Sequence, residues 1–219
     1  MTAGRDRDWD LRADELSAAA IADGRPTAWF DELYAEGVAG TVGMPWDRRD
    51  AQPELVAWWD REGHELPRGR AVVVGCGLGA DAEFLSREGW TTTAFDVAPT
   101  AIEEARRRSP GSDIDYRVES LLDLPAEWVG AFDLVVEVFT LQALPDPPRT
   151  DAARAVASLL APGGTIVLVA FRATEDEPPS GPPYPLTPAD LAAVAVDGVE
   201  LRTTEELPGQ RLRATYRRG

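Results

Sequence analysis

A chain of 219 residues is long enough for one domain with a substantial core, and its 44% hydrophobic and 27% charged residues are ordinary for a folded protein. Its 38 acidic and 22 basic residues give a net charge of −16, which argues against binding to nucleic acid or to an anionic membrane surface. The single cysteine excludes an intrachain disulfide. Because the chain also contains no apolar run of membrane-spanning length and no apolar signal region near its start, we expect a cytoplasmic protein.

The first 69 residues have the pattern of amphipathic helices. Three such helices are expected, at 11–22, 28–36 and 54–62. The third begins after Pro53 and stops at Gly63, which is the usual placement of proline and glycine at helix ends. The loop before it, AGTVGMPWDRRDAQP, carries Trp46. We expect segment 1–69 to be a helical cap on a core that spans residues 70–219, within one structural domain.

From Arg70 onward, strands alternate with helices. The expected strands are 71–74, 91–95, 114–118, 132–138 and 164–171, and the expected helices between them are 80–87, 98–108 and 149–160. The strands are almost uninterrupted runs of valine and other apolar residues, which is typical of a parallel sheet covered by helices on both faces.

The last fifth of the chain has a different pattern. A surface loop rich in proline and acidic residues follows Phe171. Thr187 and Asp190 then have the spacing of a capping box, which predicts a short helix to about residue 196. Two alternating segments, 199–207 and 211–217, predict a β-hairpin in place of a further strand–helix–strand unit.

The stretch AVVVGCGLGADAEFL places glycines between a buried strand and a helix. Gly75, Gly77 and Gly79 permit a tight turn and a close approach of backbone to a ligand, and the helix presents its free N–H groups there. Asp96 ends the next predicted strand, where a carboxylate accepts hydrogen bonds from ribose hydroxyls. Gly75-x-Gly77-x-x-Ala80 also satisfies a dinucleotide-binding pattern, so the turn alone leaves the ligand open between a dinucleotide and a methyl donor.

Three motifs favour the methyl donor. The spacing GxGxG at 75–79, the strand and turn FDLVVEVFTLQAL, and the segment ARAVASLLAPGGTIVLVA together resemble the class I S-adenosylmethionine-dependent methyltransferases over about residues 70–217. The resemblance implies a Rossmann-like, doubly wound, mostly parallel seven-stranded α/β sheet with an antiparallel C-terminal strand. Two positions depart from the usual pattern: many members have aspartate at Ser120 and an acidic residue at Val73 of the first strand.

The resemblance also implies a set of cofactor-binding residues. Asp96 is expected on the ribose, and Ser120 with the Leu121 backbone on the adenine. The full set expected to bind S-adenosylmethionine, and the product S-adenosylhomocysteine, is Trp46, Gly75, Cys76, Gly77, Gly79, Asp96, Val97, Ser120, Leu121 and Glu137.

The N-terminal segment narrows the resemblance. The stretch WFDELYAEGVAGTVGMPWDRRDAQPELVAW is similar to the thiopurine, thiol and halide methyltransferase group, in which the tryptophan matching Trp46 lies against the cofactor. A core aromatic is the alternative role for Trp46. This likeness favours a small-molecule acceptor, namely a thiol, a thiopurine or a halide.

Methyl transfer from a sulfonium depends mainly on orientation and exclusion of water, and a thiolate acceptor needs little further help. Glu137, at the end of a strand, is the best-placed acid and the one candidate catalytic residue, with capping of the backbone as its alternative role. The expected acceptor pocket contains Trp29, Phe139, Thr140 and Gln142. No His, Cys or carboxylate cluster has metal-ligand spacing, so no metal is expected.

Two other functions remain open at this point. The lack of a clear base and the Ser120 departure fit a non-enzymatic module that binds an adenosyl ligand, and the dinucleotide pattern fits an NAD(P)-dependent reductase. We expect no nucleic-acid or membrane partner, and the sequence leaves the oligomeric state open.

Overall fold

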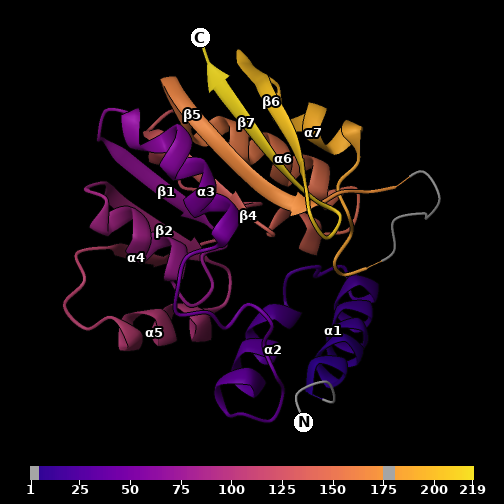
Figure 1. Ribbon diagram of the computed structural model, residues 1–219. Helices are drawn as coiled ribbons and strands as arrows, with labels where there is room; N and C mark the ends of the chain where they lie inside the picture. Colours follow the sequence, from indigo (N-terminus) through magenta and orange to yellow (C-terminus); the bar gives the residue numbers. More distant parts are fainter. Residues whose placement is uncertain (1–4, 175–180) are drawn as a thin grey trace.

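A computed structural model describes residues 5–174 and 181–219. In this part of the chain seven strands form one sheet, in the order β3–β2–β1–β4–β5–β7–β6 (Figure 1). The strands are β1 (Arg70–Val74), β2 (Thr91–Asp96), β3 (Asp115–Val118), β4 (Phe132–Val138), β5 (Leu160–Phe171), β6 (Val199–Leu207) and β7 (Arg211–Arg218). Strands β1 to β5 pair in parallel, and β7 lies antiparallel between β5 and β6. The predicted mostly parallel sheet with an antiparallel C-terminal strand is confirmed.

Helices cover both faces of the sheet, because the strands are apolar on both sides. They are α1 (Arg5–Ala22), α2 (Trp29–Val38), α3 (Pro53–Arg61), α4 (Ala80–Arg87), α5 (Pro99–Arg108), α6 (Pro148–Leu159) and α7 (Pro188–Val194). On one face α6 and α7 bury Val156 and Leu191 against Val135 and Leu168. On the other, Trp58 of α3 packs in a cluster with residues of α4, α5 and the sheet.

Most predicted elements occur within a few residues of their expected bounds. Helix α1 begins six residues earlier than expected, at Arg5. Strand β5 begins at Leu160, which pairs with Phe132, and the register then shifts so that Thr165 pairs with Leu134. The Pro162–Gly163 turn is therefore an irregularity inside one long strand. Residues 175–180 of the acidic proline loop lie outside the described residues.

The N-terminal helices fall into two groups. α1 and α2 form a separate small cluster that contains Trp9, Trp29 and Leu33, and they lie beyond one end of the sheet (Figure 1). α3 belongs to the layer on the sheet face. The division into a cap at 1–69 and a core at 70–219 stays a prediction, and only α1 and α2 have the position expected of a cap. None of the described helices is both long enough and apolar enough to span a membrane.

The direction of winding reverses between β1 and β4. The chain proceeds from β1 through β2 to β3 on one side, then continues with β4 and β5 on the other. The carboxyl ends of β1 and β4 therefore diverge into loops on opposite sides, which leaves a crevice between them. Ligands of open α/β sheets bind at such a reversal.

Candidate active site

A cavity of about 680 Å³ lies at the carboxyl ends of the parallel strands and is also lined by residues of α1 and α2. It is lined by the turns that follow β1, β2, β3 and β4, by the end of β5, and by side chains of the N-terminal helices and the loop after them. Twelve of the fourteen residues predicted for the site line it: Trp29, Trp46, Gly75, Cys76, Gly77, Asp96, Val97, Ser120, Leu121, Phe139, Thr140 and Gln142. Gly79 and Glu137 do not line it.

The glycine turn forms the floor of the cavity. Gly75 and Gly77 have backbone φ values of +56° and +51°, which residues with a side chain rarely adopt. A Cβ atom on Gly75 would collide with Thr140, and one on Gly77 would lie 2.9 Å from the Tyr34 hydroxyl. Gly79, at φ +88°, differs from them because it does not line the cavity, and a Cβ there would meet Tyr116. The turn can thus hold a ligand against bare backbone at its first two glycines.

Asp96 closes the turn from the end of β2. Its two carboxylate oxygens accept hydrogen bonds from Gly77 N and Ala98 N, both at 3.0 Å, and so join the turns that follow β1 and β2. Burial raises the pKa of Asp96 to about 6, although these N–H groups oppose the rise. Each oxygen retains a further lone pair toward the cavity. A ligand with paired hydroxyl groups is the complement of this arrangement.

The end of β3 supplies a narrower part of the wall. Leu121 is buried beside the cavity. The Ser120 hydroxyl accepts a hydrogen bond from Leu122 N at 3.2 Å, which leaves its own proton free to donate. This corner combines an apolar surface with the polar side chains of Ser120 and Glu119, which suits an adenine ring.

Glu137 is sealed beneath the cavity. Its side chain is fully buried, and one oxygen accepts hydrogen bonds from Thr140 N at 2.6 Å and Leu141 N at 2.9 Å. Burial raises the pKa of Glu137 to about 7 against these two hydrogen bonds. The geometry therefore matches the backbone-capping alternative better than contact with an acceptor. The turn that it caps presents Phe139, at φ +60°, to the cavity.

Aromatic side chains from the N-terminal segment cover the cavity. Trp46 makes edge contacts with Trp9, at 4.7 Å between ring centroids, and with Tyr34, at 5.9 Å. Trp29 stacks on Phe30 and donates a hydrogen bond to Pro26 O at 2.9 Å. All five of these rings line the cavity. The cap thus forms an apolar roof that excludes water.

Several residues outside the fourteen predicted for the site also line the cavity. Asp81, in the first turn of α4, and Arg48 line the same cavity. Pro182 and Pro183 form part of another wall, which is held in place because Tyr184 N donates a hydrogen bond to Gln142 O at 2.6 Å. The position of Asp81 just after the glycines was a usable signal. The proline wall depends on a contact between distant segments that no local pattern shows.

The cysteine of the turn is a neutral thiol. Cys76 lines the cavity, and burial raises its pKa well above the ordinary value. It is therefore not a nucleophile at neutral pH. Within the described residues no group of three or more His, Cys, Asp and Glu side chains is arranged to hold a metal ion.

This combination of a reversed parallel sheet, a glycine turn and a strand-end carboxylate defines a class I S-adenosylmethionine-dependent methyltransferase. Solved structures with the same fold include a magnesium protoporphyrin IX methyltransferase from Synechocystis with bound S-adenosylhomocysteine, at a TM-score of 0.62 and 19% identity over 76% of this chain and 81% of that one. An N-methyltransferase from Bradyrhizobium japonicum in complex with S-adenosylhomocysteine has a TM-score of 0.62 and 22% identity over 86% of this chain and 97% of that one.

The chain belongs to the thiopurine S-methyltransferase family, whose model matches residues 36–215. Among curated proteins it is 38% identical, over 138 residues, to a ubiquinone biosynthesis O-methyltransferase from Xanthomonas campestris pv. campestris. The matched region is 53% of this chain and 57% of that protein, so the match spans little more than half the length of this relative. A homologue of the same name from Xanthomonas oryzae pv. oryzae is 36% identical over a region of the same length. The family expected from the sequence is confirmed.

The site fits the cofactor of this class. From one end to the other, the reacting part of S-adenosylmethionine consists of a sulfonium that supplies the methyl group, a ribose and an adenine. The bare backbone at Gly75 and Gly77, the oxygens of Asp96 and the corner at Ser120 match these parts in order along the sheet edge.

Proposed function

We propose that the protein methylates a small molecule whose accepting atom is a soft anion, such as a thiolate, a selenolate or a halide. The observation that carries this proposal is the chemistry of the cavity wall beside β4 and β5. That wall, which we call the acceptor wall, consists of Phe139, Thr140, Gln142, Leu144, Phe171, Pro182 and Pro183. These residues supply rings, aliphatic groups and uncharged polar groups, and the charged Arg211, which pairs in register with Phe171, lines the cavity beside them.

The cofactor portion of the cavity has its own residues. Asp96 would hold the ribose hydroxyls, while Ser120 and Leu121 would enclose the adenine, and Trp46 would cover the cofactor from the N-terminal side. Because β1 lies between β2 and β4, the sulfonium would then lie above Gly75 and Cys76 and face the acceptor wall. The methyl group would thus point from the glycine turn toward Phe139 and Thr140.

The acceptor wall gives no help in removing a proton. Its ionisable neighbour Glu137 lies beneath the turn that follows β4, and one of its oxygens accepts hydrogen bonds from the backbone N–H groups of Thr140 and Leu141. An alcohol or a catechol normally needs a base or a metal ion for methylation. A thiol ionises near pH 8.5 in solution, so a useful fraction arrives as thiolate without such help. Orientation and exclusion of water under the aromatic roof then supply the rate enhancement, which reaches roughly 7–11 kcal/mol in ideal cases.

A second candidate is O-methylation of a phenolic or catechol acceptor. The observation that favours it is the name of the curated relatives, which are ubiquinone biosynthesis O-methyltransferases. The aromatic side chains that line the cavity also suit a ring-bearing acceptor.

The test is a turnover assay that measures S-adenosylhomocysteine formation with iodide, bisulfide, thiopurines, aryl thiols and catechols. We expect turnover with the thiols or the halide, without added metal. Turnover with catechols alone would contradict the soft-anion proposal and favour the second candidate. Binding of S-adenosylhomocysteine without turnover on the whole panel would point to a different acceptor class or to the non-enzymatic module.

A further inference from the structure

The amino-acid end of the cofactor requires two charged partners. S-adenosylmethionine ends in an ammonium group and a carboxylate, and burying either one without a partner is costly. Many class I methyltransferases carry an acidic residue in the first strand. Here the corresponding residue is Val73, which is 2% exposed and packs in the apolar cluster with α3, α4 and α5. A carboxylate for the ammonium group must therefore come from another element.

Asp81 is placed to be that carboxylate. It lies in the first turn of α4, directly after the glycine turn, and lines the cavity. Its Oδ1 atom accepts a hydrogen bond from Gln52 N at 2.7 Å, which fixes the side chain between α4 and the segment before α3. Its Oδ2 atom accepts no hydrogen bond from any residue that the structure describes. Burial raises the pKa of Asp81, opposed by the Gln52 N–H group and by the charge of Arg48.

Arg48 is the corresponding cation. It lines the same cavity, two residues after Trp46, and its charge acts on Asp81. It forms no ion pair with any residue in the described part of the chain. Arg211, the other arginine of the cavity lining, is already paired with Glu54. Arg48 can therefore bind an anion without first breaking an ion pair with a described residue.

The order of the strands sets which end of the cofactor reaches these residues. Adenine at the end of β3 and ribose at Asp96 of β2 direct the rest of the molecule along the sheet edge to β1. The helix that follows β1 is α4, which carries Asp81. A methyl group directed at β4 leaves the amino-acid end as the part that lies near α4 and the Trp46 loop.

We infer that Asp81 and Arg48 bind the amino-acid end of the cofactor, with the Asp81 carboxylate accepting from its ammonium group and the Arg48 guanidinium binding its carboxylate. The inference rests on the proposed cofactor geometry, in which ribose lies at Asp96. The charged partners of the amino-acid end then lie on α4 and in the Trp46 loop, because β1 has the uncharged Val73 where many members have an acidic residue.

The test compares three ligands by titration calorimetry. S-adenosylhomocysteine carries both charged groups, its decarboxylated derivative carries the ammonium group alone, and 5′-deoxy-5′-methylthioadenosine carries neither. Asp81→Asn retains an oxygen for the Gln52 N–H group, and Arg48→Gln retains much of the side-chain length. Arg49→Gln is the matched control for Arg48→Gln, since Arg49 is an exposed residue of the same loop outside the cavity lining, and Asp50→Asn tests the other carboxylate of that loop, which also lines the cavity.

We expect Asp81→Asn to lower the affinity for S-adenosylhomocysteine and for its decarboxylated derivative by about tenfold or more, and to leave the affinity for methylthioadenosine unchanged. Arg48→Gln should lower the affinity for S-adenosylhomocysteine alone, because only this ligand carries the carboxylate. Unchanged methylthioadenosine affinity also shows that the variants are folded.

Three outcomes would overturn the inference. Equal weakening of all three ligands by Asp81→Asn would mean a structural role, and an effect of Asp50→Asn in place of Asp81→Asn would assign the ammonium group to the other carboxylate. Wild-type affinity of both variants for all ligands would also overturn it, while leaving the cofactor proposal intact. Absence of S-adenosylhomocysteine binding to the wild-type protein is a separate result, which removes the cofactor proposal and this inference together.

Discussion

Strands β2 and β4 each carry near their end a buried carboxylate that accepts hydrogen bonds from backbone N–H groups, but the two carboxylates have different surroundings. Asp96 and Glu137 are both buried carboxylates, each accepts two backbone N–H groups, and burial raises their pKa values to about 6 and about 7. Asp96 uses both oxygens to join two separate turns and still borders the cavity. Glu137 uses one oxygen for two consecutive N–H groups of its own turn and lies below the cavity wall.

The role of an acidic residue at the end of a strand therefore depends on the turn that follows the strand. The turn after β2 runs directly into α5, and Asp96 remains part of the cavity lining, where the proposed ribose would lie. The turn after β4 folds back over Glu137, and Thr140 donates a hydrogen bond from its hydroxyl to Val74 O at 3.0 Å. One carboxylate is thus suited to bind a ligand and the other to fix the shape of the pocket. Four experiments test this contrast.

The largest effect is expected from Asp96→Asn on cofactor binding. The substitution removes the charge and one acceptor, so two charge-assisted hydrogen bonds to the ribose are lost or weakened. Affinity for S-adenosylhomocysteine should fall by about 3–4 kcal/mol, as measured by calorimetry. For the wild-type protein, affinity should also decline as pH falls through about 6, where Asp96 takes up a proton. Weakening of the same size in Glu137→Gln would erase the contrast between the two strand ends.

The next effect is on the pH dependence of stability, through Glu137→Gln. Folding raises the pKa of Glu137 from 4.5 to about 7, so the folded state holds this proton more tightly than the unfolded chain. Its contribution to stability is fully present below pH 4.5 and is lost as pH rises through 7. Over this interval the free energy of unfolding of the wild-type protein should therefore fall by up to about 3 kcal/mol relative to that of Glu137→Gln. Urea denaturation at several pH values measures this difference.

Two observations control that experiment. Glu127→Gln, at an exposed glutamate, should follow the wild-type pH profile. Glu137→Gln should also retain its affinity for S-adenosylhomocysteine, because the side chain lies outside the cavity lining. A parallel profile for wild-type and Glu137→Gln proteins would show that the carboxyl group does not titrate in this interval.

A smaller effect is expected from Thr140→Val, which removes the hydrogen bond between the turn after β4 and the end of β1. Loss of this bond leaves Val74 O with one fewer donor and should cost about 1 kcal/mol of stability. The acceptor wall should also become less ordered, so KM for the acceptor should rise more than that for the cofactor. Thr150→Val, at a residue whose hydroxyl donates only to exposed Asp146, is the matched control. An equal loss of stability in the two variants would mean that the β4 turn has no special support.

The sequence predicts those parts of the fold whose cause is local. The buried valines of β1 and the capping box, in which Thr187 and Asp190 exchange hydrogen bonds, depend on neighbours a few residues away. Asp96 was found because the strand–turn–helix pattern fixes which side chain follows a parallel strand. The sealing of Glu137 depends on a turn that Thr140 joins to Val74 O, 66 residues away, and the fixing of Asp81 by Gln52 N depends on a contact across 29 residues. The first was left as an open alternative and the second was missed.

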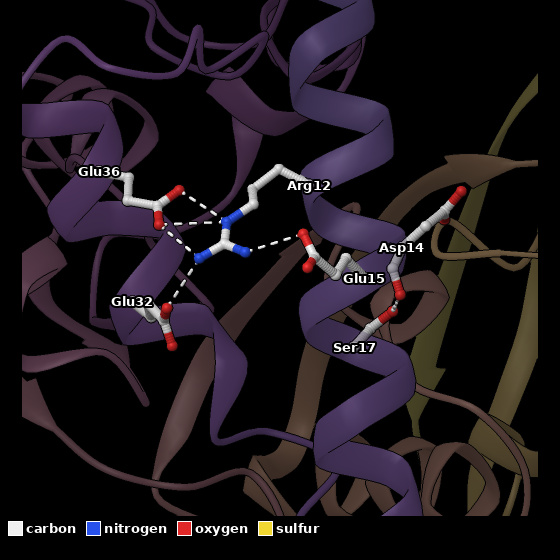
Figure 2. A network of polar contacts seen from close by, with 6 residues as sticks. All are labelled: Arg12, Asp14, Glu15, Ser17, Glu32 and Glu36. Atoms are coloured by element: carbon white, nitrogen blue, oxygen red, sulfur yellow. Dashed lines mark hydrogen bonds and ion pairs between the residues drawn. The ribbon is translucent and has the colours of Figure 1, made fainter.

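The smallest effect concerns the link that holds the cap over both strand ends. Arg12 of α1 binds Glu36 through Nε and Nη2, at 2.7 to 3.1 Å, and also reaches Glu32 of α2 and Glu15 of α1 (Figure 2). Because these groups are at the surface, salt screens their attraction. Arg12→Gln should therefore speed amide hydrogen exchange in α1 at low salt, with a smaller difference from wild type at high salt.

The cavity contact of α1 makes this link relevant to the site. Trp9 packs edge-on against Trp46, so a looser α1 weakens the roof above Asp96 before it disturbs the β4 turn. S-adenosylhomocysteine affinity should fall slightly in Arg12→Gln, and the thermal midpoint should stay close to that of wild type. Arg25→Gln is the control, since Arg25 pairs only with Asp23 two residues away. Unchanged exchange in α1 at low salt would show that apolar packing alone, through Trp9 and Leu33, holds the cap in place.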